Sequence, residues 1–272
     1  MRTCISITLL SVLALAVFTG PAMADDPKAR AIMEKVDARE DGDRSVSDMR
    51  MVLINKQGKE RVRSLRSYGM DRGDDHFSLM FFLAPADVAA TGFLTHDYDT
   101  PEKEDDQWLY LPALNKTKRI AAGDKSGSFM GSDFSYSDLT SRRLEDYDYA
   151  FHDKQPETEV YGKKVWVINV LPRGEKTSRE TGYKRTIAFV RQDNHVIIRA
   201  IYFPRNANTT KYYDVKKLEL IDGIWTDTEI HMTTKKGKQT VHKTILTFDN
   251  VKYNQDSVNE NFFTIRRLEK GP

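Results

Sequence analysis

The stretch SVSDMRMVLIN, residues 45–55, alternates between polar and apolar side chains. Met49, Met51 and Leu53 fall on one face, because successive side chains of a strand point to opposite faces of a sheet. KQGKE then supplies a turn, and RVRSLRSYG returns as a second, more highly charged strand. The stretch therefore predicts the first hairpin of an antiparallel sheet, and it leaves open which face of that sheet is concave.

The same period of two recurs through most of the chain. The further strand candidates are HFSLMFFL, FLTHDY, QWLYLPALNKTKRI, EDYDYAFHD, KKVWVINVLP, YKRTIAFVRQ, HVIIRAIYFP, TKYYDVKKLELI, IWTDTEIHMTTK and QTVHKTILTFDNVKY. Turn signals such as Asp222-Gly223 and Lys236-Gly237 separate many of them. APADVAATG offers a short helical turn that starts at Pro85. Roughly eleven strands in meander order predict a mainly β fold, a sandwich or a barrel.

Only one segment has a clear helical period. Asp25 or Asp26 can cap it, and Pro27 suits the first helical position. The apolar positions that share one face are Ala29, Ile32, Met33 and Val36. Gly42 ends the pattern, so we expect one N-terminal helix ahead of the sheet.

Residues 1–24 have the pattern of a secretory signal peptide. Arg2 precedes an apolar run from Ile5 to Phe18, and Ala22-Met23-Ala24 is a small-residue cleavage site. The run is too short to span a membrane as a helix. We expect a cut after Ala24. Removing 24 of the 272 residues leaves 248, and these contain no cysteine because the single one is Cys4.

Charge and composition narrow the class of protein. Lys and Arg number 42 against 40 Asp and Glu, and the two signs are interspersed. A nucleic-acid surface would need a segregated basic stripe, so none is expected. Many strands have too short a charge-free face to span a membrane, which disfavours an integral membrane barrel. With no linker and no fixed-period repeat, residues 25–272 are predicted to form a single domain.

Signatures of catalysis are poor. The six histidines are dispersed and lack metal-binding spacing. No nucleophile with a partnering base can be named, and GDKSG does not match the serine elbow of hydrolases. We therefore predict a protein that is not an enzyme and binds neither a metal nor another cofactor. A hydrolase of lipid substrates is the least favoured alternative.

The segment FMGSDFSYSDL (Phe129–Leu139) is unusually apolar for a loop. Its large side chains are Phe129, Met130, Phe134, Tyr136 and Leu139. Burying each is worth about 1.5–3 kcal/mol, so they are expected to cover the mouth of a curved sheet. Gly127 and Gly131 would serve as hinges, and Ser135 or Ser137 would cap a short helix. Such a segment could be a lid over a ligand or a simple cap that completes a core.

Three motifs resemble the LolA-like family of periplasmic outer-membrane lipoprotein-sorting proteins, in its longer branch. They are WLYLPALNKTKRI (Trp108–Ile120), GSFMGSDFSYSDL (Gly127–Leu139) and FDNVKYNQDSVNENFFTIRRLEK (Phe248–Lys270). The resemblance covers most of the chain after the signal peptide. The second motif is specific to that branch, and the third is shared more loosely.

This resemblance implies an unclosed antiparallel β-barrel with an N-terminal helix and a short helical lid over its concave face. It also implies a soluble periplasmic carrier of the acyl chains of a lipoprotein or lipid, moving cargo between inner and outer membrane. An inner-membrane transporter of the resistance-nodulation-division (RND) type is the implied partner.

Expected lipid-binding residues come from both the sheet and the lid. The sheet candidates are Met49, Met51, Leu53, Phe82, Trp108 and Tyr110; the lid candidates are Phe129, Met130, Phe134, Tyr136 and Leu139. The alternative function is a non-ligand accessory or scaffold protein of an envelope exporter complex. An open apolar cavity of several hundred Å³ would favour the carrier, and a well-filled core beneath the lid would favour the scaffold.

Overall fold

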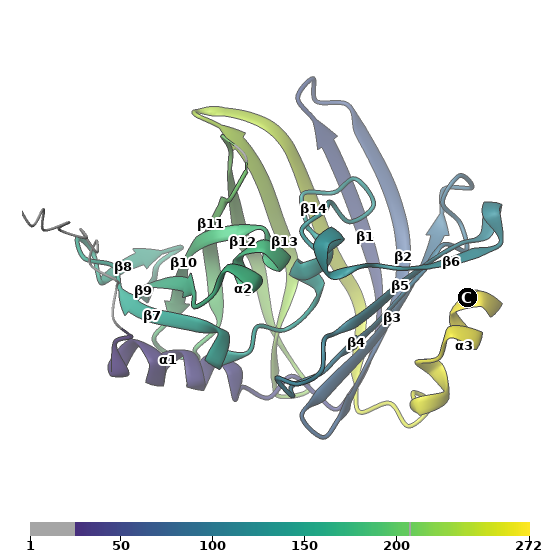
Figure 1. The fold of residues 1–272 in the computed structure, drawn as a ribbon, viewed down its shortest axis with the longest axis horizontal. Coiled ribbons are helices and arrows are strands. Elements are labelled where there is room, and N and C mark those ends of the chain that lie inside the picture. Colours follow the sequence, from purple (N-terminus) through teal and green to yellow (C-terminus); the bar gives the residue numbers. More distant parts are fainter. Residues whose placement is uncertain (1–24, 207) are drawn as a thin grey trace, which may run out of the picture.

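The computed structural model describes residues 25–206 and 208–272, so the predicted signal peptide lies outside the described residues. One sheet of 14 antiparallel strands dominates it and curves into an open trough (Figure 1). The order is β6-β5-β4-β3-β2-β1-β14-β13-β12-β11-β10-β9-β7, and β8 also pairs with β9. The sheet does not close, which confirms the predicted half-barrel.

The elements have the following bounds. The helices are α1 Pro27–Asp37, α2 Glu175–Thr181 and α3 Ile265–Lys270. The short 3₁₀ helices are η1 Pro112–Leu114, η2 Ala122–Asp124, η3 Tyr136–Leu139, η4 Leu144–Asp146 and η5 Glu260–Phe262. The first strands are β1 Arg44–Asn55, β2 Glu60–Arg72, β3 Asp75–Ala84, β4 Gly92–Asp97, β5 Asp106–Leu111, β6 Lys116–Arg119 and β7 Tyr147–Phe151. The remaining strands are β8 Glu157–Val160, β9 Lys163–Pro172, β10 Tyr183–Arg191, β11 Ile197–Pro204, β12 Thr210–Ile221, β13 Ile224–Lys236 and β14 Gln239–Tyr253.

The chain enters the sheet at its middle. Strand β1 pairs with β2 on one side and with the last strand, β14, on the other. Each half is a meander that ends at one edge, so β6 and β7 lie at opposite edges although they follow each other in the chain. Residues 120–146, called here the covering segment, connect these two edges and cross the inside of the trough (Figure 1).

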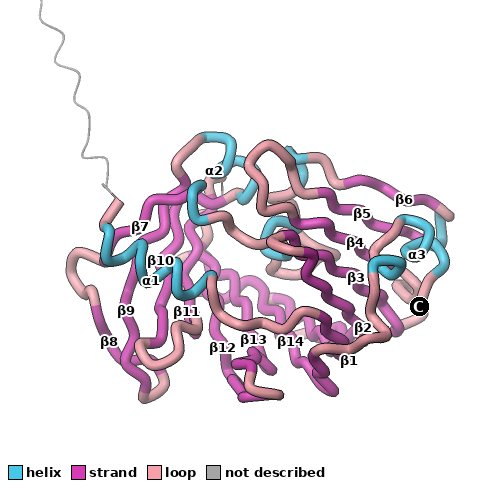
Figure 2. The backbone as a smooth tube through the Cα atoms, turned by 90° about the horizontal axis from the view of Figure 1, so that it is seen from below, coloured by secondary structure: helices cyan, strands magenta, loops and turns pink. Residues whose placement is uncertain are grey.

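Helices cover two other parts of the sheet (Figure 2). Asp26 caps α1 through Lys28 N and Ala29 N, as predicted. The α1 residues Ala29 and Met33 pack with β7, β9 and β10, for example with Tyr149 and Ile168. At the other end of the sheet, α3 packs on β4 and β5 from the outside of the trough.

Most strand predictions are confirmed within a few residues, and the differences concern short elements. The sequence pattern missed β8, α2 and α3, which are 4, 7 and 6 residues long. Residues 86–90 form hydrogen-bonded turns where a short helical turn from Pro85 was predicted, and Val88 N donates to Pro85 O at 3.1 Å. Among residues 25–206 and 208–272, no helix is both long and apolar enough to cross a membrane.

Candidate functional site

The inner face of the β1–β5 half of the sheet is apolar. Cross-strand pairing aligns Met49 with Leu65 and Leu65 with Phe82. A second row aligns Phe93 with Met80 on one side and with Leu109 on the other. All of these side chains are buried in one cluster with residues of the covering segment. The trough therefore has an apolar floor that the covering segment closes.

The tip of the covering segment is a tight turn. Phe129 N donates to Phe134 O at 2.8 Å, and Ser128 pairs with Ser135 as an isolated bridge. Between them, Met130 and Gly131 have φ angles of 49° and 75°. Two successive left-handed residues reverse the chain sharply, and glycine is the residue that adopts this region without strain. The turn directs both phenylalanines toward the sheet.

A capped 3₁₀ helix follows the turn. The Ser135 hydroxyl accepts from Asp138 N, and the Asp138 carboxylate accepts from Ser135 N, which is a capping box. Of the two serines predicted as caps, the structure uses Ser135. The single turn of helix carries Tyr136 and Leu139 to the apolar floor, and Ser137 turns the opposite way and lines a polar cleft.

Aromatic rings fill the space beneath the covering segment. The Phe129 ring centroid lies 5.0 Å from that of Phe93 and 6.1 Å from that of Phe82. Tyr136 lies 5.7 Å from Phe93 and from Phe129, centroid to centroid. Phe129 is only 1% exposed and Phe134 only 6%. The structure is thus a closed state in which the segment's own side chains occupy the apolar interior.

One buried carboxylate ties the tip of the covering segment to the far half of the sheet. Thr234 Oγ1 donates to Asp133 Oδ1 at 2.5 Å, and Thr244 Oγ1 donates to Oδ2 at 2.7 Å. His242 Nδ1 lies 2.7 Å from Oδ2, and Thr244 Oγ1 also accepts from Asp133 N at 2.9 Å. A carboxylate buried this deeply needs several partners to offset its lost hydration. Asp133 is therefore an anchor for the segment.

Two polar side chains of the near half contact the same segment. Arg63 donates from Nη1 to Met130 O at 2.6 Å, and its guanidinium lies 5.7 Å from the Phe82 ring centroid. Burial lowers the pKa of Arg63, and the nearby Arg61 adds to this effect. Gln107 Nε2 donates to Tyr136 O at 2.9 Å. Arg63 and Gln107 therefore add hydrogen bonds to backbone carbonyls of the segment beside its apolar contact with the floor.

The structure brings nine of the eleven predicted lipid-binding residues together. The apolar cluster around the covering segment contains Met49, Met51, Leu53, Phe82, Phe129, Met130, Phe134, Tyr136 and Leu139. It places Trp108 and Tyr110 elsewhere, and this corrects their predicted position. Both lie on the outer face in a second cluster with Phe263 and Leu268 of the C-terminal segment.

The reason for that error is a strand buried on both faces. In β5, Leu109 and Leu111 pack in the inner cluster while Trp108 and Tyr110 pack in the outer one. Tyr110 pairs across the sheet with Gly92, where a Cβ would lie 2.5 Å from Leu268. Because α3 packs against this strand from outside, both faces of the strand are buried and apolar. The alternation of side chains along the strand therefore does not show which face is the inner one.

Several residues of the interior were not predicted from the sequence. Phe93 and Met232 are buried at its centre, and each follows the strand alternation. Arg63 belongs to the strand that the sequence predicts to be the more highly charged, yet it is 8% exposed while its neighbour Val62 is 41% exposed. The only sequence signal for the burial of Arg63 was its spacing, which places it on the same strand face as Arg61 and Leu65.

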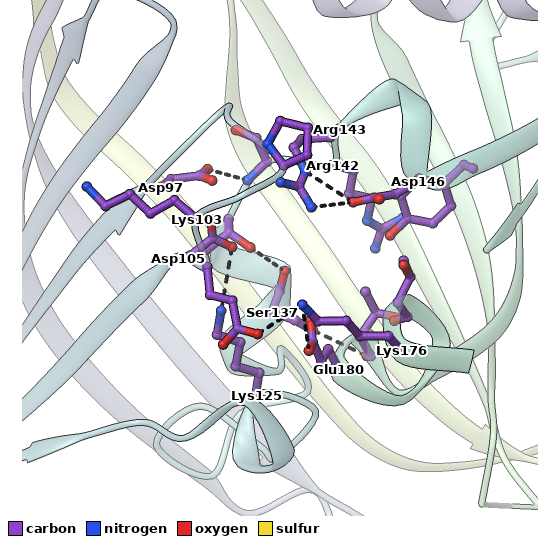
Figure 3. A pocket seen from close by; sticks show the side chains of 17 residues that line it. Asp97, Lys103, Asp105, Lys125, Ser137, Arg142, Arg143, Asp146, Lys176 and Glu180 are labelled. Atoms are coloured by element: carbon purple, nitrogen blue, oxygen red, sulfur yellow. Dashed lines mark hydrogen bonds and ion pairs between the residues drawn. The ribbon is translucent and has the colours of Figure 1, made fainter. Parts of the chain in front are cut away.

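A charged cleft of about 250 Å³ lies beside the end of the covering segment (Figure 3). Asp97 Oδ2 accepts from Ser141 N at 2.6 Å, and Lys125 Nζ lies 3.6 Å from Asp105 Oδ2. These contacts join both ends of the segment to β4 and to the residues before β5. Burial and the nearby Asp97 carboxylate raise the pKa of Asp105 to about 6. No group of His, Cys, Asp and Glu within the described residues is arranged to hold a metal ion.

Comparison with known proteins identifies the same architecture elsewhere. The profile of a family described as uncharacterized protein matches residues 74–270. A solved domain from Vibrio parahaemolyticus, described as an outer membrane lipoprotein-sorting protein domain, shares 29% identity at a TM-score of 0.79. That similarity covers 89% of this chain and 98% of the Vibrio chain.

Two further solved structures are similar. A DUF1329 family protein from Desulfovibrio piger shares 29% identity at a TM-score of 0.78, over 89% of this chain and 98% of that one. A LolA superfamily protein from Nitrosomonas europaea has the same fold at a TM-score of 0.65, with 15% identity over 88% of this chain and 98% of its own. No curated protein sequence matches the chain significantly.

Proposed function

The chain belongs to the LolA-like family, and from this premise we propose that it is a soluble periplasmic carrier. Residues 25–272 would form one carrier domain that shelters the acyl chains of a lipoprotein or lipid. The protein would move this cargo between the inner and outer membranes as a carrier rather than an enzyme. The description of the Vibrio relative as a lipoprotein-sorting domain supports the cargo class.

The observation that carries the proposal is the nature of the contact between the covering segment and the sheet. Phe129, Phe134 and Tyr136 pack their rings against an apolar floor. The polar contacts of this part of the segment are made by other groups, chiefly the carboxylates of Asp133 and Asp138. An acyl chain that displaced the three rings would restore comparable apolar burial, at about 25 cal/mol per Å². Loading and release would then be nearly balanced in free energy, as a carrier requires.

The role of a partner follows from that balance. If closed and loaded states are close in free energy, a protein that binds one of them preferentially can drive loading or release. The family resemblance implies an inner-membrane transporter of the RND type as the donor of cargo. This transporter would drive loading by binding one of the two states preferentially. Copurification of the protein with such a transporter from crosslinked cells would test this part of the proposal.

A second candidate function is an accessory or scaffold protein of an envelope exporter complex. The filled interior favours it, because Phe129 and Phe134 leave the concave face closed and well packed. In that case the covering segment would complete the core of the fold and would never leave it.

Native mass spectrometry of the protein, purified gently from its own periplasm, distinguishes the two functions. The carrier predicts a defined acylated species that is lost when Phe134 and Tyr136 are both changed to Ser. A matched control changes Tyr68 and Phe262, which stack on the outer face with ring centroids 5.1 Å apart, to Ser. The control should keep the ligand. An apo mass, even after incubation with envelope lipids and lipopeptides, would support the scaffold.

A further inference from the structure

Two hairpins gather positive charge at one end of the sheet. Residues 56–61 of the β1–β2 hairpin read KQGKER, and residues 235–239 of the β13–β14 hairpin read KKGKQ. These two segments are called here the basic rim. Glu60 is their only carboxylate. The cations of the basic rim are Lys56, Lys59, Arg61, Lys235, Lys236 and Lys238, and all but the half-buried Lys235 are exposed.

The fold brings the two hairpins together from distant parts of the chain. Strand β1 pairs with β14, and Asn55 lies opposite His242. Because Asn55 is the last residue of β1, the β13–β14 hairpin extends past the β1–β2 turn on the same side of the molecule. Both tips project beyond the covering segment, at the top of Figure 1. Charges that are interspersed along the sequence are therefore segregated in the folded chain.

The positive charge of the basic rim is not compensated by ion pairs. The exposed Arg44 and Lys217, which lie elsewhere on the sheet, each pair with a carboxylate. Within residues 25–206 and 208–272, no ion pair involves a cation of the rim. Lys235 Nζ lies 4.8 Å from the centroid of the Tyr212 ring, and such a contact leaves its charge available to other partners.

The opposite end of the sheet is acidic. Strand β2 runs from the rim to the β2–β3 turn, and His76 just after this turn pairs with Asp97. The turn at residues 71–75 therefore lies beside the loop at residues 97–106, and together they hold nine carboxylates and two cations. Charge is thus separated along the strands although the chain is nearly neutral. This separation would orient the molecule with its rim toward an anionic surface.

The basic rim continues the strands that hold the tip of the covering segment. Thr234 and His242, which bind the Asp133 carboxylate, lie next to the rim in β13 and β14. Arg63, which donates to Met130 O at 2.6 Å, follows the rim in β2. A surface bound to the rim would therefore lie near the tip, where the proposed carrier opens.

We propose that the basic rim docks the protein reversibly on the surface of an anionic phospholipid bilayer. This inference rests on the proposed carrier function and adds to it the surface by which the carrier meets a membrane. Each lysine or arginine near an anionic bilayer strengthens binding about fivefold. Interfaces between proteins instead disfavour lysine and centre on aromatic and apolar side chains. The rim contains no apolar residue, so a bilayer surface fits it better than a folded partner does.

Vesicle flotation tests the proposal with protein purified from the periplasm. One set of vesicles contains phosphatidylglycerol and phosphatidylcholine at about 3:7, and the other contains phosphatidylcholine alone. We expect the anionic vesicles to bind the wild type at least about tenfold more tightly. Raising NaCl from about 0.1 M to about 0.5 M should release the protein, because salt screens exposed charges.

A quadruple variant locates the binding to the rim. Changing Lys56, Lys59, Lys236 and Lys238 to Gln should weaken binding to the anionic vesicles at least about thirtyfold. The matched control removes the same charge from four exposed lysines on α1 and beside β8, with Lys28, Lys35, Lys154 and Lys163 changed to Gln. It should lose less than about threefold. Both variants alter only exposed side chains. Equal losses would show that net charge drives binding, and would overturn the rim as a docking surface.

The remaining outcomes separate this inference from the proposed function. A wild type that carries an acylated species in native mass spectrometry, yet binds both kinds of vesicle equally or binds neither, would support the carrier and overturn the docking surface. Rim-dependent binding by a protein that never carries an acylated species would support the docking surface and overturn the carrier. Absence of vesicle binding combined with rim-dependent crosslinking to an inner-membrane transporter would replace the bilayer by an acidic protein, and would overturn the proposal.

Discussion

At the scale of single residues, the closed state depends on how a buried carboxylate is solvated. Asp133 is 5% exposed, yet hydroxyl groups and an imidazole from β13 and β14 surround both of its oxygens. Such a carboxylate is favourable only while all its partners are present, because each unmet hydrogen bond leaves a buried polar group. The anchor is therefore specific to the closed position of the covering segment.

Removing this anchor should weaken the closed state. We expect Asp133→Ala to lower the free energy of unfolding by about 1–3 kcal/mol, since it leaves donors of Thr234, Thr244 and His242 without their acceptor. Urea denaturation measures the loss, and faster hydrogen exchange at the amides of residues 129–134 would locate it. Asp124→Ala, which removes a carboxylate 59% exposed on the same segment, is the control. Equal effects of both changes would contradict the anchor.

A second buried carboxylate makes stability depend on pH. Burial raises the pKa of Asp227 to about 6, although Tyr213 Oη donates to it at 3.0 Å. The folded chain therefore holds a proton here, between about pH 4 and pH 6, that the unfolded chain has released. The contribution of Asp227 to stability consequently falls as the pH rises through this interval.

Asp227→Asn should remove that dependence. Between pH 4.5 and 7.5, the free energy of unfolding of the variant should gain about 1–3 kcal/mol relative to that of the wild type. Urea denaturation at the two pH values gives this difference directly. The exposed Asp249→Asn serves as the matched control and should show no such relative gain. A constant difference between Asp227→Asn and wild type would show that Asp227 does not titrate in this range.

At the scale of elements, the covering segment is placed by its two ends and by its tip. Asp97 and Asp105 contact its ends through Ser141 and Lys125, and Asp133 binds its tip to β14. The proposed function requires the tip and the short helix to leave the floor while the ends remain attached. Such local opening would break the contacts of Asp133 and those of the Met130 and Tyr136 carbonyls, so an incoming ligand or partner has to offset their loss.

A disulfide across the tip would test this movement. Asp133 N and Thr244 Oγ1 are 2.9 Å apart, so cysteines at positions 133 and 244 would face each other in a span that contains no native cysteine. The oxidised double variant should lose at least about tenfold in affinity for a palmitoyl amphiphile, and reduction should restore binding. Both single-cysteine variants are controls. Undiminished binding by the crosslinked protein would place the acyl site outside the closed interior.

At the scale of the whole molecule, an open sheet leaves two edges. Strand β6 forms one of them, and its sequence is KTKR. Exposed cations on an edge strand oppose pairing with the edge of another molecule, because they repel each other and remain hydrated. A half-barrel can thus remain open along its edge without forming a continuous sheet with its neighbours.

Replacing the edge cations should promote self-association. We expect Lys116→Val combined with Lys118→Val to shift the protein toward dimers and larger species in sedimentation velocity, at concentrations where the wild type is smaller. Lys217→Val combined with Lys252→Val changes exposed cations on β12 and β14, which are paired on both sides. If this control associates to the same extent, added hydrophobic surface rather than the free edge is responsible.

The type of each long element and most of the inner face follow from the amino-acid pattern alone. Alternation over β1, β12 and β14 predicts their bounds closely, because strands with one covered face must place apolar residues at every second position. Apolar residues in a polar loop likewise identified the covering segment and its contact with the sheet, because so much apolar surface is costly in water.

Where both faces of a strand are covered, only the folded arrangement shows which face lies inside the trough. Trp108 and Tyr110 were predicted inside because their strand is apolar on both sides, and only the packing of α3 against Gly92 shows that they lie outside. The folded arrangement also places Arg63 beneath the covering segment and Arg142 against Tyr183 and Tyr202, two tyrosines far from it in the sequence. Local periodicity carries no information about such contacts, because they form between segments brought together only by the curvature of the sheet.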